Sequence, residues 1–164
     1  MLLPPTPHDE NARLAALRAL NILDTHPEER FDRLTRIAKR VFGVPFSTIS
    51  MIDAHRQWFK SIQGLSLCET SRDISFCAHA ILFDEILFVE NALKDERFHD
   101  NPVVLGEPKI RFYAGCSLNV RGFKMGTFCV FDKKPRAFTS EDRQLLMDLA
   151  VLAERELALP SPSN

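Results

Sequence analysis

Two neighbouring segments near the end of the chain alternate between apolar and more polar or smaller residues. Residues 111–118 and 125–132 both show this period of two and are rich in strand-forming side chains. Asn119 and Gly122 lie between them and tolerate the positive φ angles that tight turns need. The pattern predicts an antiparallel β-hairpin over these two segments.

Three other segments carry the spacing of amphipathic helices. Apolar residues recur three or four positions apart over Asp9 to Leu20, from near Thr25 to Phe42, and over Ser140 to Leu157. Thr139 and Asp142 match a capping box at the start of the last segment. We expect a helix in each of the three.

The middle of the chain predicts shorter elements. Phe46 to Ile52 reads as a strand, and Gln57 to Ile62 as its antiparallel return after a turn. Ser75 to Leu82 predicts a short helix, and Ile86 to Val89 another strand. This order of helices and hairpins predicts an α+β fold, an α/β/α sandwich with an antiparallel sheet at its centre.

Two long connections remain, Leu65 to Asp73 and Asp95 to Pro108. We expect Leu65 to Arg72 to be irregular. Long connections inside a compact domain often carry function, so both are candidate walls of a binding cavity, while plain surface packing is the alternative.

Length and charge restrict the protein class. The 164 residues suit one domain at 1–159, with a core at about 12–157 and a linker-like tail at 160–164. With 21 basic and 22 acidic residues, neither charge forms a block that would attract nucleic acid or a membrane surface.

The chain has no apolar run of about 18 residues and no signal peptide pattern, so we expect a cytoplasmic protein. Its four cysteines lack zinc-pair spacing and predict free thiols.

The hairpin and the start of the last helix resemble a GAF domain. The matching residues are RFYAG at Arg111 to Gly115, then Gly126, Thr127, Cys129, Val130, Asp132, Pro135, Arg136, Phe138, Glu141 and Asp142. The resemblance covers roughly 12–157. It implies a sheet of about five to six strands, with the first and last helices on one face and a ligand pocket on the other.

The segment DISFCAHAI, at Asp73 to Ile81, resembles a motif of bacterial GAF modules attached to histidine kinases and diguanylate cyclases. Asp73, Phe76, Cys77 and His79 are therefore candidate ligand-binding residues. A helix capped by Ser75 would place Cys77 in its first turn, where the dipole lowers a thiol pKa. The alternative is a buried cysteine and a satisfied imidazole. Phytochrome-like GAF domains hold a tetrapyrrole through a cysteine here with histidine directly after it, whereas this chain has Ala78 between them.

Four further residues are candidates because of the strand faces they share. Trp58 and Lys60 lie on one face of a strand, and Arg111 and Tyr113 on one face of a later strand. If both faces line one cavity, they offer an aromatic wall, two cations and a phenol, which suit a small planar or anionic ligand. The alternative is that the Trp and Tyr are core or rim residues.

Enzymatic readings find little support in the sequence. Free methionine sulfoxide reductases are GAF proteins whose cysteine positions Cys68 and Cys77 superficially imitate, but Asp95 to Ile110 lacks the attacking cysteine. Walker, zinc, dinucleotide-turn and serine-elbow motifs are also absent from the sequence. The cyclic-nucleotide GAF signature is not reproduced over Asn91 to Asp100. We expect a protein that is not an enzyme.

The sequence thus predicts a non-catalytic sensor that binds a small molecule between the sheet and the pocket helix and acts on a signalling partner. It names neither the ligand nor a cofactor. One alternative is a ligand-free dimerisation module whose terminal helices share apolar stripes, formed by Leu14, Leu17, Leu20, Leu145, Leu149 and Leu152. Another is a redox or chromophore-binding sensor that uses Cys77, with Cys68 as the candidate partner in the redox form.

Overall fold

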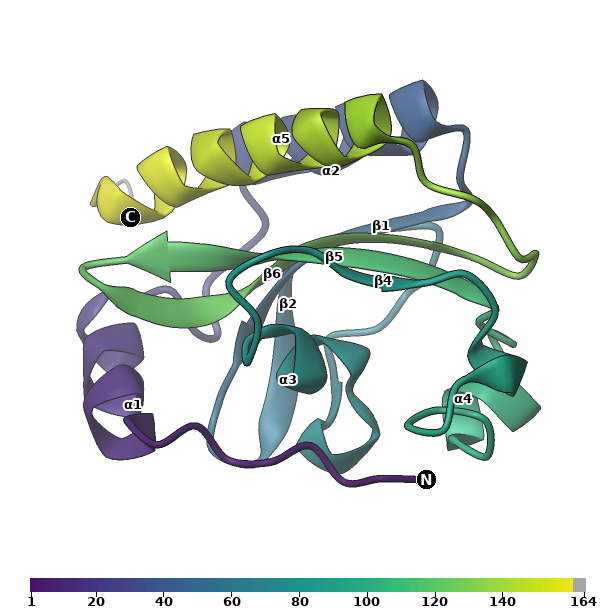
Figure 1. Cartoon of the computed structure of the whole chain (residues 1–164). Helices are drawn as coiled ribbons and strands as arrows, with labels where there is room; N and C mark the ends of the chain where they lie inside the picture. Colours follow the sequence, from purple (N-terminus) through teal and green to yellow (C-terminus); the bar gives the residue numbers. More distant parts are fainter. Residues whose placement is uncertain (161–164) are drawn as a thin grey trace.

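Six antiparallel strands form one sheet, in the order β3-β2-β1-β6-β5-β4, in the computed structural model, which describes residues 1–160 (Figure 1). The strands are β1 (Phe46–Ile52), β2 (Arg56–Gln63), β3 (Glu69–Ser71), β4 (Leu87–Val89), β5 (Phe112–Val120) and β6 (Phe123–Asp132). The two predicted hairpins, β1-β2 and β5-β6, are confirmed, and β1 of the first pairs with β6 of the second at the centre of the sheet. Strand β3 lies where an irregular connection was expected, because three of its residues pair with the start of β2.

The helices are α1 (Glu10–Ala19), α2 (Glu29–Phe42), α3 (Phe76–Ala80), α4 (Pro102–Leu105) and α5 (Ser140–Ala158), with 3-10 turns η1 (Arg72–Ile74) and η2 (Ala92–Lys94). The capping box of α5 is present, with Thr139 and Asp142 bonded to each other's backbone N–H groups. Helix α2 begins at Glu29 and not near Thr25. The Thr25 hydroxyl and the His26 carbonyl oxygen both accept hydrogen bonds from Lys60, which holds this segment outside the helix.

Helices α2 and α5 lie side by side over one face of the sheet (Figure 1). The partner of α5 on this face is therefore α2, whereas the resemblance implied the first helix, α1. Helix α1 packs instead against β6 near the β5-β6 turn. Its buried Arg13 donates to the carbonyl oxygens of Lys124 and Ile52, which fixes the helix at that end of the sheet.

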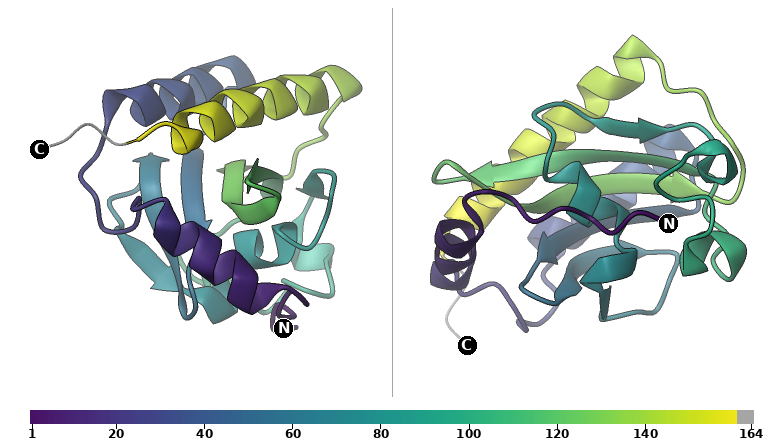
Figure 2. Two further views of the ribbon diagram at one scale, coloured as in Figure 1. Left: turned by 90° about the vertical axis from the view of Figure 1, so that its left-hand side faces the viewer. Right: turned by 60° about the horizontal axis from the view of Figure 1, so that its bottom comes forward.

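Each face of the sheet has its own apolar cluster. The cluster under α2 and α5 includes Phe112 and Phe128, and the cluster under α3 includes Phe76, Tyr113 and Phe131. Successive strand residues point to opposite faces, so the alternation seen in the sequence divides each strand between the two clusters. The α3 side is also crossed by the N-terminal segment that precedes α1 (Figure 2).

Among residues 1–160, no helix is long and apolar enough to cross a membrane. The predicted linker-like tail at 160–164 lies outside the described residues from position 161 onward. The described elements run from Glu10 to Ala158 around one sheet.

Candidate functional site

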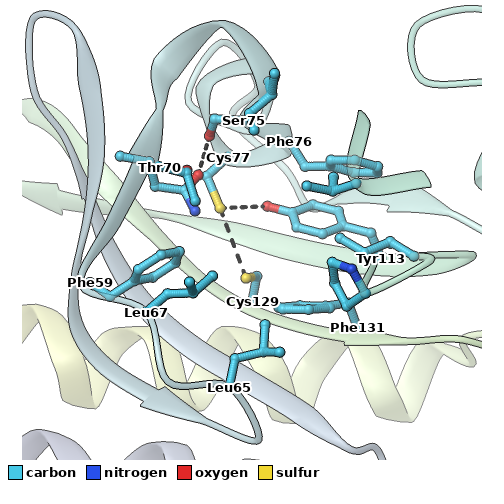
Figure 3. Close-up of a pocket in the computed structure, with 15 residues that line it drawn as sticks. Phe59, Leu65, Leu67, Thr70, Ser75, Phe76, Cys77, Tyr113, Cys129 and Phe131 are labelled. Atoms are coloured by element: carbon cyan, nitrogen blue, oxygen red, sulfur yellow. Dashed lines mark hydrogen bonds between the residues drawn. The ribbon is translucent and has the colours of Figure 1, made fainter. Parts of the chain in front are cut away.

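A cavity of about 60 Å³ lies between the sheet and α3 (Figure 3). It exceeds the ~10–15 Å³ that one water molecule needs, and it is smaller than the ~300–1,000 Å³ of sites for drug-sized ligands. Its floor is made by side chains of three strands: Gln57, Phe59, Tyr113, Cys129 and Phe131. In this form the cavity accommodates only a small molecule.

The two long connections supply much of the remaining wall. Leu65, Leu67 and Thr70 come from the first, and Val103 and Pro108 from the second. The geometry agrees with the expectation that these connections surround a cavity. Binding of a ligand there stays a prediction.

Three polar side chains meet at one end of this mostly apolar space (Figure 3). The Tyr113 hydroxyl donates to the Cys77 sulfur across 3.2 Å. The sulfur atoms of Cys77 and Cys129 are 3.8 Å apart, and the Thr48 hydroxyl lies 2.9 Å from the Cys129 sulfur. A ligand in the cavity would meet a phenol and two thiols at this end.

Local capping places Cys77 at the cavity. The Ser75 side chain accepts a hydrogen bond of 3.0 Å from the Ala78 N–H, as the sequence predicted, and it also bonds to Gln57 on β2. These contacts start α3 directly above the sheet. Cys77 consequently lies in the first turn of α3 and only 2% of its surface is exposed.

The two thiols differ in acidity. Burial raises the pKa of Cys77, but hydrogen bonds from Cys129, Ser50, Thr127 and Tyr113 together outweigh it and bring the pKa to about 7. Burial raises the pKa of Cys129 well above its usual value. Burial likewise raises the pKa of Tyr113, so its hydroxyl stays protonated and remains a donor. Hydrogen bonding therefore favours a thiolate at Cys77, whereas burial disfavours one at Cys129.

Phe76 holds α3 to the connection that precedes α4. Its ring stacks on Phe98 with centroids 3.9 Å apart and also contacts Tyr113. Asn101 caps α4 through the Val103 N–H and donates to the carbonyl oxygen of Ile74 at 3.1 Å. This part of the connection therefore holds α3 and α4 in place.

Trp58 and Lys60 do not reach the cavity, and the expectation that they share it with Tyr113 is wrong. Trp58 belongs to the apolar cluster under α2 and α5. The Lys60 ammonium is buried 2.7 Å from the Glu28 carboxylate and donates to the Thr25 hydroxyl. The neighbouring side chain of Phe59 faces the cavity instead, because adjacent strand residues point to opposite faces.

Three other predicted site residues lie around the cavity but do not line it. Arg111 donates to the carbonyl oxygens of Val104 and Ile110 and so holds the second connection. Asp73 lies on η1 beside a separate surface hollow. The Nε2 atom of His79 is 3.3 Å from the Leu2 carbonyl oxygen, and burial lowers the pKa of this imidazole. Of the eight predicted residues, Phe76, Cys77 and Tyr113 are brought together.

Cys129 is the main residue that sequence reasoning missed as part of the site. The alternation of the hairpin could have indicated it, because Cys129 and Phe131 lie two residues apart and alternate with residues of the other face. The register pairs Phe131 with Tyr113 and Cys129 with Gly115, so all four lie on the α3 face.

The chain is an α+β domain, with an antiparallel sheet that has paired helices on one face and a small cavity under a short helix on the other. The model of the GAF domain family matches residues 26–157. The chain belongs to the GAF domain family.

A curated relative and two solved structures are similar to the chain. Over 142 residues the chain is 42% identical to a cyclic di-GMP phosphodiesterase of Pseudomonas aeruginosa, an alignment that covers 86% of this chain and 24% of that protein. The chain therefore spans about a quarter of the length of this curated relative. The crystal structure of the GAF domain from an Acinetobacter phosphoenolpyruvate-protein phosphotransferase has a TM-score of 0.68 at 22% identity, covering 90% of this chain and 93% of that one.

The free methionine-R-sulfoxide reductase of Neisseria meningitidis, solved in complex with its substrate, has a TM-score of 0.65 at 15% identity and covers 96% of both chains. At such identities the two solved structures establish the shared fold alone.

Proposed function

We propose that this chain is a non-catalytic sensory GAF domain in which the cavity under α3 binds a small, mostly apolar molecule. The observation that carries this proposal is the cavity itself, which is mostly apolar, is lined by both long connections and has Cys77, Cys129 and Tyr113 gathered at one end. Apolar walls with a few convergent polar groups are typical of ligand sites.

The lining narrows the ligand chemistry. Among the described residues that line the cavity, none is Lys or Arg. An anionic ligand, which the sequence suggested through Lys60 and Arg111, would therefore be desolvated without a counter-charge. We expect a neutral molecule with one hydrogen-bonding atom directed at the Tyr113 hydroxyl and the Cys77 sulfur.

We also propose that the domain regulates an output in cyclic di-GMP signalling. Support comes from the Pseudomonas aeruginosa relative, of which this chain matches about a quarter. Within this domain, β6 carries Cys129 and Phe131 at the cavity and continues into the segment before α5. There Arg136 binds Asp132 at 2.6 Å and the carbonyl oxygens of Phe42 and Gly43 at the end of α2. A ligand that shifts β6 would be sensed by both outer helices.

The proposal that the domain is not an enzyme rests on the sequence. The fold is shared with a methionine-R-sulfoxide reductase, but in this chain the segment 95–110 contains no cysteine. The cavity of this chain has its thiols on α3 and β6 instead. Absence of methionine sulfoxide reduction by the purified protein is the expected result of a direct assay.

Binding of a small molecule in the cavity can be tested directly. The purified protein is weighed by native mass spectrometry and again after denaturation, and its unfolding temperature is measured with and without xenon as a small, neutral probe. We expect either a ligand mass that is lost on denaturation or a rise in unfolding temperature with xenon. Val103→Phe should abolish the effect because Val103 lines the cavity.

Leu105→Phe is the matched control, since Leu105 lies on the same helix and is 62% exposed. A ligand effect retained in Val103→Phe, or absent from the wild-type protein in both measurements, contradicts the proposed site.

A second candidate function is dimerisation through the outer helices. Five apolar side chains are exposed on α2 and α5: Ile37, Val41, Met147, Val151 and Leu152. The stripe expected from the sequence is different, because Leu17 and Leu149 are buried within the chain. If the domain dimerises there, Val151→Glu converts a dimer to a monomer in sedimentation experiments. A wild-type mass that stays monomeric at all concentrations rejects the idea.

A further inference from the structure

We propose that Cys77 and Cys129 form a dithiol site that reacts with a small hydroperoxide in the cavity, and that the product is a disulfide joining α3 to β6. This inference rests on the proposed sensing role of the cavity, and it replaces reversible binding by a covalent event. It concerns a different pair from Cys77 and Cys68, which the sequence suggested.

The geometry of the two sulfurs supports a bond between them. They are in van der Waals contact at 3.8 Å, and both face the same cavity (Figure 3). A disulfide needs about 2.05 Å between sulfurs, so they must approach further. Cys77 lies on a helix of five residues, which can adjust more easily than the paired strand that carries Cys129.

The size and polarity of the cavity limit which oxidants can reach the two thiols. The space of about 60 Å³ admits hydrogen peroxide or a small alkyl hydroperoxide and excludes large peroxides. Apolar walls also favour a neutral hydroperoxide over a charged oxidant. The oxidant that fits is thus small and uncharged.

Cys77 is the attacking thiol. The Tyr113 hydroxyl donates to its sulfur at 3.2 Å, and a thiolate at this position would also accept from Cys129. These donors stabilise negative charge on Cys77 and favour ionisation near neutral pH. Cys129 retains its proton and acts second.

The reaction balances in two steps. The Cys77 thiolate attacks the terminal oxygen of the hydroperoxide, the O–O bond breaks, and the released alkoxide or hydroxide takes a proton and leaves as alcohol or water. Cys77 is then a sulfenic acid. The Cys129 sulfur attacks the Cys77 sulfur, the S–O bond breaks, and hydroxide leaves with the Cys129 proton as water. Two thiols lose two electrons in total, and the hydroperoxide gains them.

The other two cysteines lack this arrangement. Cys68 is exposed and lines a different hollow on the surface. Burial raises the pKa of Cys116 to about 11, and its strand position places it on the face covered by α2 and α5. Oxidation in the folded protein should therefore select the Cys77 and Cys129 pair.

The experiment treats the reduced, folded chain with hydrogen peroxide and maps its peptides by mass. We expect the loss of two hydrogen atoms and a peptide that joins Cys77 to Cys129. Cys129→Ser should stop at a sulfenic acid on Cys77 that dimedone traps, and Cys77→Ser should leave Cys129 unmodified. The double variant Cys68→Ser/Cys116→Ser should react like the wild-type protein.

Tyr113→Phe tests the positioning role of the phenol. We expect oxidation to slow about tenfold at neutral pH, since a hydrogen bond to a charged group contributes at least about 1.5 kcal/mol. The pH at which Cys77 becomes reactive should also rise. Such a shift would not follow from a merely structural change.

Three results would overturn the inference: both thiols unmodified by excess peroxide in the folded protein, a disulfide with Cys68, or oxidation only after unfolding. The test is separable from that of the proposed function. If Cys77→Ser keeps the noncovalent ligand effect while the wild-type thiols resist peroxide, the proposed ligand site is retained and the dithiol site is rejected.

Discussion

A β-carbon at position 115 would collide with the hydroxyl oxygen of Tyr113, which stands two residues earlier on β5. The two positions share a face of the strand, so any side chain at Gly115 would occupy the space that the Tyr113 ring crosses. Gly115 thereby allows the phenol to lie along the sheet and reach Cys77.

Gly115→Ala should lower the free energy of unfolding by about 1–3 kcal/mol, because the added methyl group overpacks a buried site. Urea unfolding measures the loss. In a Tyr113→Leu background the same substitution should cost much less, since the colliding hydroxyl is gone. Equal losses in the two backgrounds would show that the contact between Gly115 and Tyr113 is not the cause.

Lys60→Met should lower the free energy of unfolding by about 3 kcal/mol, because it removes one partner of a buried ion pair with Glu28. Oxidation of Cys77 by peroxide should be unchanged, since Lys60 lies on the opposite face of the sheet. Chemical denaturation and peptide mapping give the two readouts. If Lys60→Met has the stability of the wild-type protein but loses the ligand effect, Lys60 belongs to the ligand site after all.

His79 should make the protein less stable as the pH falls below about 6.5. Burial and the nearby Arg97 charge lower the pKa of His79 in the folded state, so unfolding takes up a proton in this range. The stability that neutral His79 contributes is therefore fully present above its pKa in the unfolded chain. It is lost as the pH falls from there through the lowered pKa of the folded state. Unfolding free energies measured from pH 7 to 5 should vary less for His79→Gln than for the wild-type protein.

The carboxylates that have lowered pKa values, such as Asp95, act at more acidic pH and do not obscure this window. An unchanged slope in His79→Gln would assign the pH dependence to another group.

Glu10→Gln should destabilise the protein by about 3 kcal/mol. The Glu10 carboxylate accepts from Arg13 at 2.6 Å and from Arg72 at 2.9 Å, and Arg13 is only 1% exposed. The substitution leaves two guanidinium groups without their counter-charge. Glu29→Gln is the control, because Glu29 pairs with Arg36 on the exposed surface and its loss should hardly affect stability. Similar thermal stability of the two variants would contradict the prediction.

Local pattern predicted most of the fold. The alternation of β5 and β6 and the helical spacing of α2 and α5 depend on nearby residues, so one sequence is enough to identify them. Strand β3 was missed because its three residues pair with Arg56 to Trp58 across an intervening loop. Nothing in so short a segment indicates a partner.

The candidate site was only partly predictable. Strand alternation separates Trp58 from Phe59, but both are apolar and both faces of this sheet are covered, so the pattern does not say which face holds the cavity. The capping serine placed Cys77 correctly on α3. The contact between Cys77 and Cys129 depends on how α3 docks on the sheet, which is a tertiary property.

The pairing of Phe46 with Phe131 at the centre of the sheet has a consequence for biosynthesis. A ribosome makes about 5–20 residues per second, so the β1-β2 hairpin emerges several seconds before β6 exists to pair with it. During that interval the inner edge of β1 has no neighbour and can attract other nascent chains. Production of this domain should therefore depend on chaperones that shield β1 until translation reaches the last hairpin.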